Sequence, residues 1–218
     1  MPVLLGPAAR RWAWCSFTLG LWSAVGGIYV NDNCAEITPI IGESMSPTLS
    51  PRYAATGAVD RVLWQKVGPL GVPPSRLRRG DVVLFHSPHH PERDVVKRII
   101  ATEGDVVRPD PRRRPERLRD GADLPASRAW DVVAARGGER VPEGHVWVEG
   151  DNWRKTRDSN TYGPVSKSLI LGKATAVVWP LERFGTRPWE GYRSRTEVVP
   201  GSVVKRDEME VVDAIRYG

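Results

Sequence analysis

Cysteine is scarce in this chain, and acidic residues begin late. Only 2 of the 218 residues are cysteines, Cys15 and Cys34. If the chain between them is helical, their Cα atoms stand roughly 28 Å apart, whereas a disulfide requires a separation below about 7 Å. A disulfide framework within the chain is therefore excluded. No acidic residue precedes Asp32, so every charged side chain before it is positive.

The region between residues 36 and 180 also lacks the apolar period of long amphipathic helices. The 19 prolines and 21 glycines of the chain indicate many turns between short strands. We therefore predict a mainly β fold, with one domain over residues 32–185. Residues 108–140 are predicted to be an insertion or mobile loop, and residues 186–218 a charged C-terminal tail. The expected strands cover residues 36–42, 59–64, 81–85, 95–101, 145–149 and 174–179.

The first 31 residues are predicted to be a targeting and membrane segment. Residues 12–30 contain no charged side chain and follow Arg10-Arg11, and their number is close to the roughly 20 residues that span hydrocarbon as a helix. We expect an uncleaved transmembrane helix here; a cleaved secretory signal and a buried helix are the alternatives. The acid-free start fits mitochondrial import, although composition does not separate it from a bacterial plasma-membrane protein.

The net charge of +6 comes largely from arginine clusters at residues 77–79 and 108–119. No aromatic-rich binding motif accompanies the arginines, so nucleic acid is not an expected partner. We predict that these clusters are solvated loops. Contact of the same arginines with anionic lipid headgroups is the alternative.

Three separate segments contain residue types suited to peptide hydrolysis. The first has a serine before a Met-Ser-Pro-Thr sequence, the second has a lysine in an apolar run, and the third is rich in Gly, Asp and Asn. They are Ile41-Gly-Glu-Ser44-Met-Ser-Pro-Thr-Leu49, Val95-Val-Lys97-Arg-Ile-Ile100, and Glu149-Gly-Asp-Asn152 with Asp158-Ser-Asn160.

Lys97 is the candidate base for Ser44. A serine becomes an effective nucleophile when a base takes its proton, and a desolvated lysine can do so without histidine or metal. The neighbouring Arg98 is excluded because a guanidinium does not lose its proton in proteins. In a strand, Lys97 shares one face with Val95 and Ile99, and an apolar face lowers a lysine's pKa. We therefore predict a Ser44/Lys97 catalytic dyad.

The order and wording of these segments resemble the type I signal peptidase family of membrane-bound Ser/Lys endopeptidases. The resemblance covers about residues 12–185 and implies a signal-peptidase-like β domain behind one transmembrane helix. It also implies that the backbone N–H of Ser44 binds the oxyanion. Some bacterial relatives add a serine hydroxyl two residues earlier, where this chain has Gly42, so the second donor stays open. Met45 follows the nucleophile in the family motif and is placed with Gly42 around the oxyanion.

The last segment supplies the predicted supporting residues. By the same resemblance, Thr156 keeps a hydroxyl able to orient Lys97, in a position where many bacterial members have serine. Asp151 and Asp158 are interpreted as braces of the site rather than catalysts. Asn160 stands where many bacterial members have arginine.

No metal or other cofactor is expected. His86, His89 and His90 lie around a proline, without the cysteine or acidic spacing that is typical of zinc sites, and are interpreted as a polar hairpin loop. His145 begins an expected strand, which disfavours it as the base of a Ser/His/Asp triad.

The resemblance is strongest to the mitochondrial members of the family and implies a function. We expect a single-pass protein of the mitochondrial inner membrane whose catalytic domain faces the intermembrane space and removes sorting presequences. Its expected partners are presequence-bearing substrates, a related catalytic subunit in a hetero-oligomer, and the lipid bilayer. The alternatives are a bacterial or thylakoid signal peptidase and, in another class, a catalytically silent membrane-tethered scaffold subunit.

Overall fold

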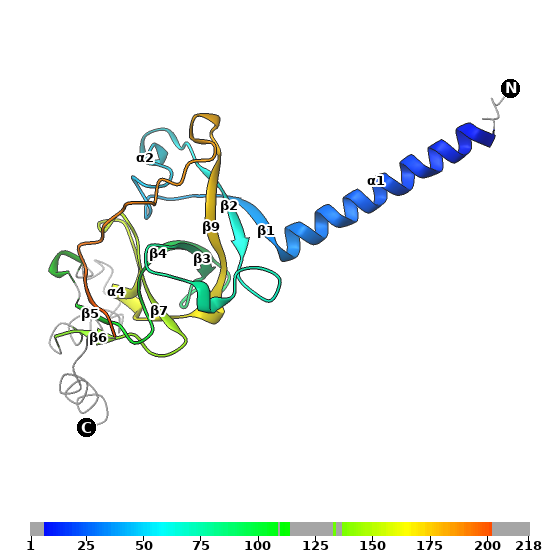
Figure 1. Ribbon diagram of the computed structural model, residues 1–218. Helices are drawn as coiled ribbons and strands as arrows, with labels where there is room; N and C mark the ends of the chain where they lie inside the picture. The colour runs from blue at the N-terminus through cyan, green and yellow to red at the C-terminus, as the bar shows by residue number, and fades with distance from the viewer. Residues whose placement is uncertain (1–6, 109, 114–132, 134–136, 202–218) are drawn as a thin grey trace.

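Two antiparallel sheets form the body of the protein (Figure 1). The computed structural model describes residues 7–108, 110–113, 133 and 137–201. The larger sheet has seven strands in the order β1-β2-β9-β3-β4-β7-β8, and the smaller has the order β10-β5-β6. The larger one contains β1 (Ala35–Pro39), β2 (Arg61–Lys66), β3 (Val82–His86), β4 (Asp94–Thr102), β7 (His145–Glu149), β8 (Val165–Ser166) and β9 (Ile170–Trp179); the smaller one contains β5 (Val106–Arg108), β6 (Glu139–Arg140) and β10 (Glu197–Val199).

The helical elements are few and mostly short. The long N-terminal helix precedes the first strand. The other helical elements are single turns that lie between consecutive strands. The α-helices are α1 (Pro7–Asn33), α2 (Tyr53–Thr56) and α4 (Ser159–Tyr162); the 3-10 turns are η1 (Pro74–Arg76), η2 (Pro111–Arg113), η3 (Lys167–Leu169) and η4 (Leu181–Arg183). The prediction of a mainly β fold is therefore confirmed.

The larger sheet is buried on both faces in its centre, which is why its inner strands read as continuous apolar runs. Successive β3 residues point to opposite faces. Val82 and Leu84 pack into one core cluster, and Val83 and Phe85 into another. The first cluster also contains Met45 and Leu49, from the loop that carries Ser44, so the core holds this loop against the sheet.

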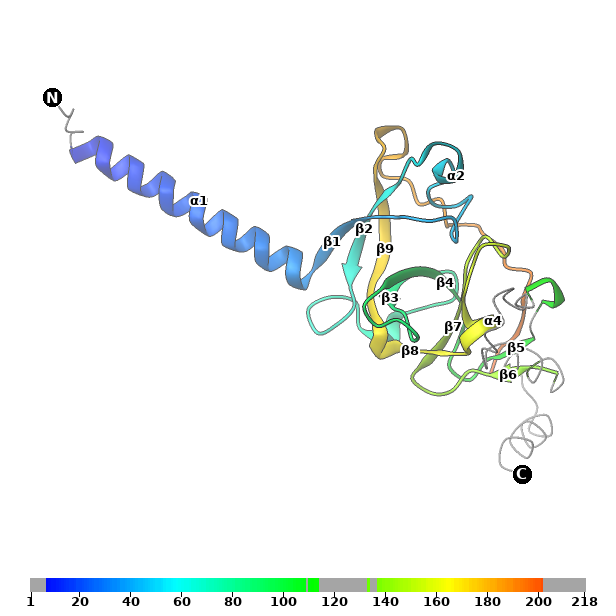
Figure 2. The ribbon, with the colours of Figure 1, turned by 180° about the vertical axis from the view of Figure 1, so that it is seen from behind.

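Helix α1 points away from the β domain in both opposite views (Figures 1 and 2). It contains residues 12–30, where we expected a transmembrane helix. In the part of the chain that the structure describes, no helix combines enough length with enough apolar character to cross a bilayer. The expectation of a spanning segment is corrected accordingly. The stretch mixes Ser16, Thr18, Ser23 and three glycines with its apolar residues, which lowers its mean hydropathy.

The chain beyond residue 185 packs on the β domain as far as it is described. Trp189 is buried in the first core cluster, and β10 pairs with β5. The segment predicted as a charged tail therefore contributes Trp189 and Val198 to the core and a strand to the smaller sheet. Most of the predicted insertion at 108–140 and the end of the tail, residues 202–218, lie outside the described residues.

Candidate active site

Ser44 lies in the loop between β1 and β2. Its neighbour Met45 is buried and anchors the loop in the core. Gly42 has a φ of +103°, a conformation that residues with a Cβ rarely adopt. Asn152 fixes the loop from the other side, because its backbone N–H donates to the Ser44 carbonyl at 3.0 Å and its Nδ2 to the Glu43 carbonyl at 3.1 Å. Met45 and Asn152 thus hold the loop on either side of Ser44.

Lys97 reaches Ser44 from β4. Its Nζ lies 2.9 Å from Ser44 Oγ and 3.0 Å from the Val96 carbonyl oxygen. The residue is 4% exposed and shares its face of β4 with Val95 and Ile99, which pack in the second core cluster. Burial lowers the pKa of Lys97 to about 8, against the opposing charges of Asp158 and Asp151. A neutral amine is therefore accessible near physiological pH.

Arg98 points to the opposite face of β4 and fixes the segment after β7. Its Nε and Nη2 donate to the two carboxylate oxygens of Asp151 at 2.8 and 2.6 Å. Its Nη1 donates to the carbonyl oxygens of Gly80 and Trp189. A bidentate pair of this kind is geometrically specific. Asp151 is thus held by a buried arginine, and its role as a brace of the site stays a prediction.

Asp158 stabilises the same segment, which follows β7, from its C-terminal end. It caps α4 and accepts from the backbone N–H of Asn160, and its Oδ2 accepts from the backbone N–H of Gly150 at 3.0 Å. Gly150 has no room for a side chain, since an added Cβ would lie 2.6 Å from the Cβ of Thr156 and 2.7 Å from the Ser44 carbonyl oxygen. This packing places the Gly-Asp-Asn segment directly against the serine.

Thr156 lies in this packed region, but it does not hold Lys97 in the structure. Its buried Oγ1 has no hydrogen-bond partner among the described residues. The role predicted for this hydroxyl, orienting Lys97, stays a prediction.

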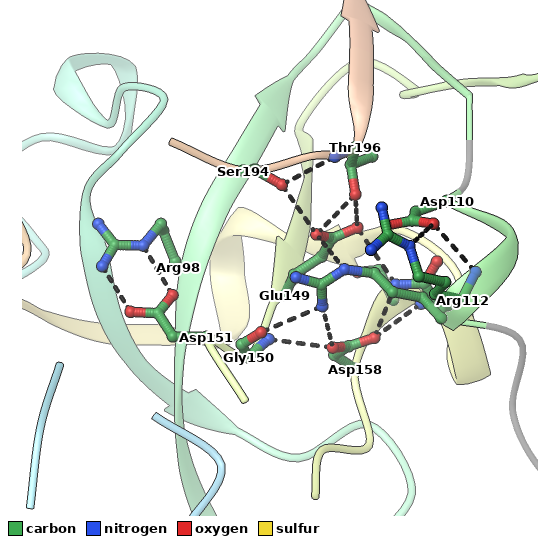
Figure 3. Close-up of polar contacts among 12 residues, drawn as sticks. Arg98, Asp110, Arg112, Glu149, Gly150, Asp151, Asp158, Ser194 and Thr196 are labelled. Carbon is green, nitrogen blue, oxygen red and sulfur yellow. Dashed lines mark hydrogen bonds and ion pairs between the residues drawn. The ribbon is translucent and has the colours of Figure 1, made fainter. Parts of the chain in front are cut away.

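Two further charged residues of this region had no predicted role in the site. Arg113 and Glu149 are buried and form an ion pair, with Nε 3.2 Å from the carboxylate. Figure 3 shows the Glu149 carboxylate beside the side chains of Ser194 and Thr196. Arg113 belongs to the arginine cluster that we interpreted as solvated or lipid-bound, and for this residue that interpretation is wrong. Nothing in the run of arginines distinguishes it from Arg112, which is exposed.

The histidines lie in other surroundings. The Nδ1 of His145, at the start of β7, is 2.8 Å from the Glu143 carbonyl oxygen, and the Nδ1 of His86 is 2.7 Å from Asp94. Within residues 7–108, 110–113, 133 and 137–201, no group of His, Cys, Asp and Glu residues is arranged to hold a metal ion.

A mainly β domain that places a serine against a buried lysine has the features of a peptidase of the signal peptidase class. The sequence profile described as signal peptidase, peptidase S26, matches residues 11–179. The chain therefore belongs to the S26 signal peptidase family.

Three similar curated proteins are subunits of mitochondrial inner membrane proteases. Subunit 2 from Saccharomyces cerevisiae is 36% identical over 72% of this chain and 75% of its own length. Subunit 2 from Mus musculus is 35% identical over 81% and 85%. The ATP-independent inner membrane protease subunit 1a from Arabidopsis thaliana is 40% identical over 68% and 73%. Among solved structures, a signal peptidase I from Enterococcus faecalis is 22% identical, with a TM-score of 0.32, over 45% of this chain and 96% of that one.

Proposed function

We propose that the protein is a serine endopeptidase that removes sorting presequences from proteins delivered to the mitochondrial intermembrane space. The observation that carries this proposal is the 2.9 Å contact between Ser44 Oγ and Nζ of the buried Lys97. The names of the similar proteins support the mitochondrial substrate class, and the lowered pKa of Lys97 supports its role as the base.

The geometry supports the following reaction. Lys97 Nζ in its neutral form accepts the hydroxyl proton as Ser44 Oγ attacks the scissile carbonyl carbon. The negative charge that develops on the carbonyl oxygen is stabilised by the backbone N–H of Ser44, in the turn that Gly42 and Met45 shape. The Lys97 ammonium then gives its proton to the leaving amine as the C–N bond breaks. A water then gives a proton to Lys97 as it attacks the acyl carbon. The bond from this carbon to Ser44 Oγ breaks as the Lys97 ammonium returns the proton to the serine, and the new carboxyl group is released.

The substrate is proposed to bind as an extended strand added to a sheet edge, with small residues near the cut. The larger sheet ends at β1 and β8, and an unpaired strand edge offers main-chain donors and acceptors to a peptide. β1 leads directly to the Ser44 loop, so a peptide aligned beside it would have its register fixed near the nucleophile.

The test is cleavage of a presequence-bearing substrate by the purified full-length protein. We expect the wild type to release the mature product and Ser44→Ala to release none above background, because the nucleophilic oxygen is missing. Ser46→Ala, two residues along the same loop, is the matched control and should retain activity. A wild type that folds and assembles with a related subunit but cleaves nothing would favour the silent scaffold. Full activity in Ser44→Ala would reject this nucleophile.

The proposed location is the mitochondrial inner membrane, with the β domain in the intermembrane space and a related catalytic subunit as partner. The names of the relatives support the membrane and the partner. Helix α1 is proposed to attach the domain to the membrane, because its uncharged stretch exposes large apolar side chains such as Trp14, Leu19 and Trp22. Trp residues favour the membrane–water interface.

This location predicts a pattern of protease accessibility. Protease added to mitochondria with ruptured outer membranes should digest the domain beyond residue 34 while the inner membrane is intact. Digestion only after the inner membrane is opened would show that the domain lies on the opposite side of this membrane. Membrane association should also be lost when residues 1–33 are deleted. If the truncated protein stays with the membrane, attachment through α1 is rejected.

A further inference from the structure

Arg113 places a buried guanidinium between two buried carboxylates. Its Nε lies 3.2 Å from a carboxylate oxygen of Glu149, and its Nη1 lies 3.6 Å from a carboxylate oxygen of Asp158. The side chain of Arg113 is 6% exposed, and those of the two acids are 1% and 3% exposed. Buried charges in such contact are strongly coupled, because removing one partner leaves the other uncompensated in a low-dielectric region.

The same guanidinium is linked to the serine through backbone. Its Nη1 also donates to the Gly150 carbonyl oxygen at 3.1 Å, and the N–H of Gly150 donates to Asp158 at 3.0 Å. Gly150 packs against the Ser44 carbonyl, to which Asn152 donates. Arg113 therefore holds the carbonyl side of a segment whose next residues set the position of the nucleophile.

Residues 187–201, which we term the C-terminal strap, pack against the cluster formed by Arg113, Glu149 and Asp158. Thr196 Oγ1 lies 2.8 and 2.9 Å from the two carboxylate oxygens of Glu149, and Ser194 Oγ lies 3.3 Å from one of them (Figure 3). Tyr192 lies over the guanidinium of Arg98, with 4.2 Å to the ring centroid. The strap begins after residue 179, where the family profile ends, so the profile does not account for these contacts.

The charges around Lys97 connect the cluster to the proposed reaction. Asp158 and Asp151 act on the Lys97 ammonium and raise its pKa against burial. Asp151 is paired with Arg98, whereas Asp158 has Arg113 at 3.6 Å and shares that cation with Glu149. Tyr162 is neutral, because burial raises the pKa of this phenol and the negative charge of Asp158 raises it further. Arg113 is thus the cation that offsets Asp158 next to the base.

We propose that Arg113 is a positioning residue for the Ser44/Lys97 pair, and that Thr196 of the C-terminal strap assists it by fixing the Glu149 carboxylate. Arg113 clamps the backbone at Gly150 and offsets the negative charge of Asp158. This role rests on the proposed function, since it acts on the Ser44 nucleophile. It adds a residue outside the three motifs and gives the strap a function in catalysis.

The experiment compares Arg113→Met with Arg112→Met in the full-length protein. Arg112 is adjacent and exposed, and it pairs only with Asp110 among the described residues, so its variant should cleave like the wild type. Arg113→Met should lower kcat about 100-fold, as expected for a misplaced reacting group, with a smaller change in KM. The rising limb of its pH–rate profile should move to higher pH, because Asp158 without its cation stabilises the Lys97 ammonium.

Two further variants keep the test decisive if Arg113→Met folds poorly. Arg113→Lys retains the charge but lacks the separate Nε and Nη1 donors to Glu149 and Gly150, so it should recover the pH profile but only part of kcat. Thr196→Val removes one hydroxyl at nearly constant volume and should lower kcat without moving the profile far. Full activity and an unshifted profile in a folded Arg113→Met would overturn the inference. Cleavage by Ser44→Ala would instead reject the proposed function itself, so the two failures are distinguishable.

Discussion

Replacing Lys97 with arginine is expected to lower kcat/KM about 1000-fold, to the level of Ser44→Ala. The structure gives the reason, because Lys97 Nζ is within 2.9 Å of the Ser44 hydroxyl and buried. Arginine keeps a positive charge and similar length but does not accept a proton at working pH. The cleavage assay on purified full-length variants measures this directly.

The double variant Ser44→Ala/Lys97→Arg should be hardly worse than either single variant, because the two side chains act as one unit. Lys173→Arg is the matched control. This lysine is in β9, is half-buried and pairs with Asp81, so its charge-conserving replacement should preserve activity. If a folded Lys97→Arg enzyme cleaved at near-normal rate, Lys97 would be an electrostatic brace, and another residue would have to be the base.

Gly150→Ala is expected to lower activity at least 100-fold, although it adds a single methyl group. The new Cβ would meet the Thr156 side chain and the Ser44 carbonyl oxygen, the latter at 2.7 Å. The backbone at residue 150 cannot move away from these atoms without breaking the hydrogen bonds of Gly150 to Asp158 and Arg113. Overpacking of this kind costs about 1–3 kcal/mol, so thermal unfolding should also occur at lower temperature.

Gly26→Ala provides the control for Gly150→Ala. It makes the same chemical change in helix α1, where an added Cβ would have nothing within 4 Å. Activity of the purified protein should be unchanged by this control. Wild-type cleavage by Gly150→Ala would mean that the Ser44 loop can shift freely, which is incompatible with a nucleophile held in place by this segment.

The strands were predictable because their residues carry strong local signals. Val82–Phe85 and the apolar part of β4 are rich in β-branched and aromatic residues, and turn residues bound them. All six expected strands are present. Residues 145–149 coincide with β7, whereas the other five have shifted ends; residues 36–42, for example, became Ala35–Pro39. The proximity of Ser44 and Lys97 was also predicted, although only through the family resemblance, since 53 residues separate them in the chain.

The contributions of Arg113 and the C-terminal strap were not predictable from local patterns. An arginine in a Pro- and Arg-rich run has the sequence signature of a solvated loop, and its burial depends on two acids that come from β7 and the cap of α4. Residues 187–201 lack periodicity because they pack through single contacts, such as Trp189 in the core and Thr196 on Glu149. Such long-range partners leave no trace in a single segment. In α1, the helix was predicted from the uncharged stretch, but its apolar character was overestimated.

The pH dependence of kcat/KM for the full-length enzyme tests the neutral-lysine mechanism most directly. Burial lowers the pKa of Lys97 to about 8, and only the neutral amine accepts the Ser44 proton. Activity should therefore fall as the pH drops below about 8 and rise to a plateau above it, until other groups titrate. A rise centred near pH 6.5, the ordinary value of histidine, would contradict the account and assign the base to an imidazole.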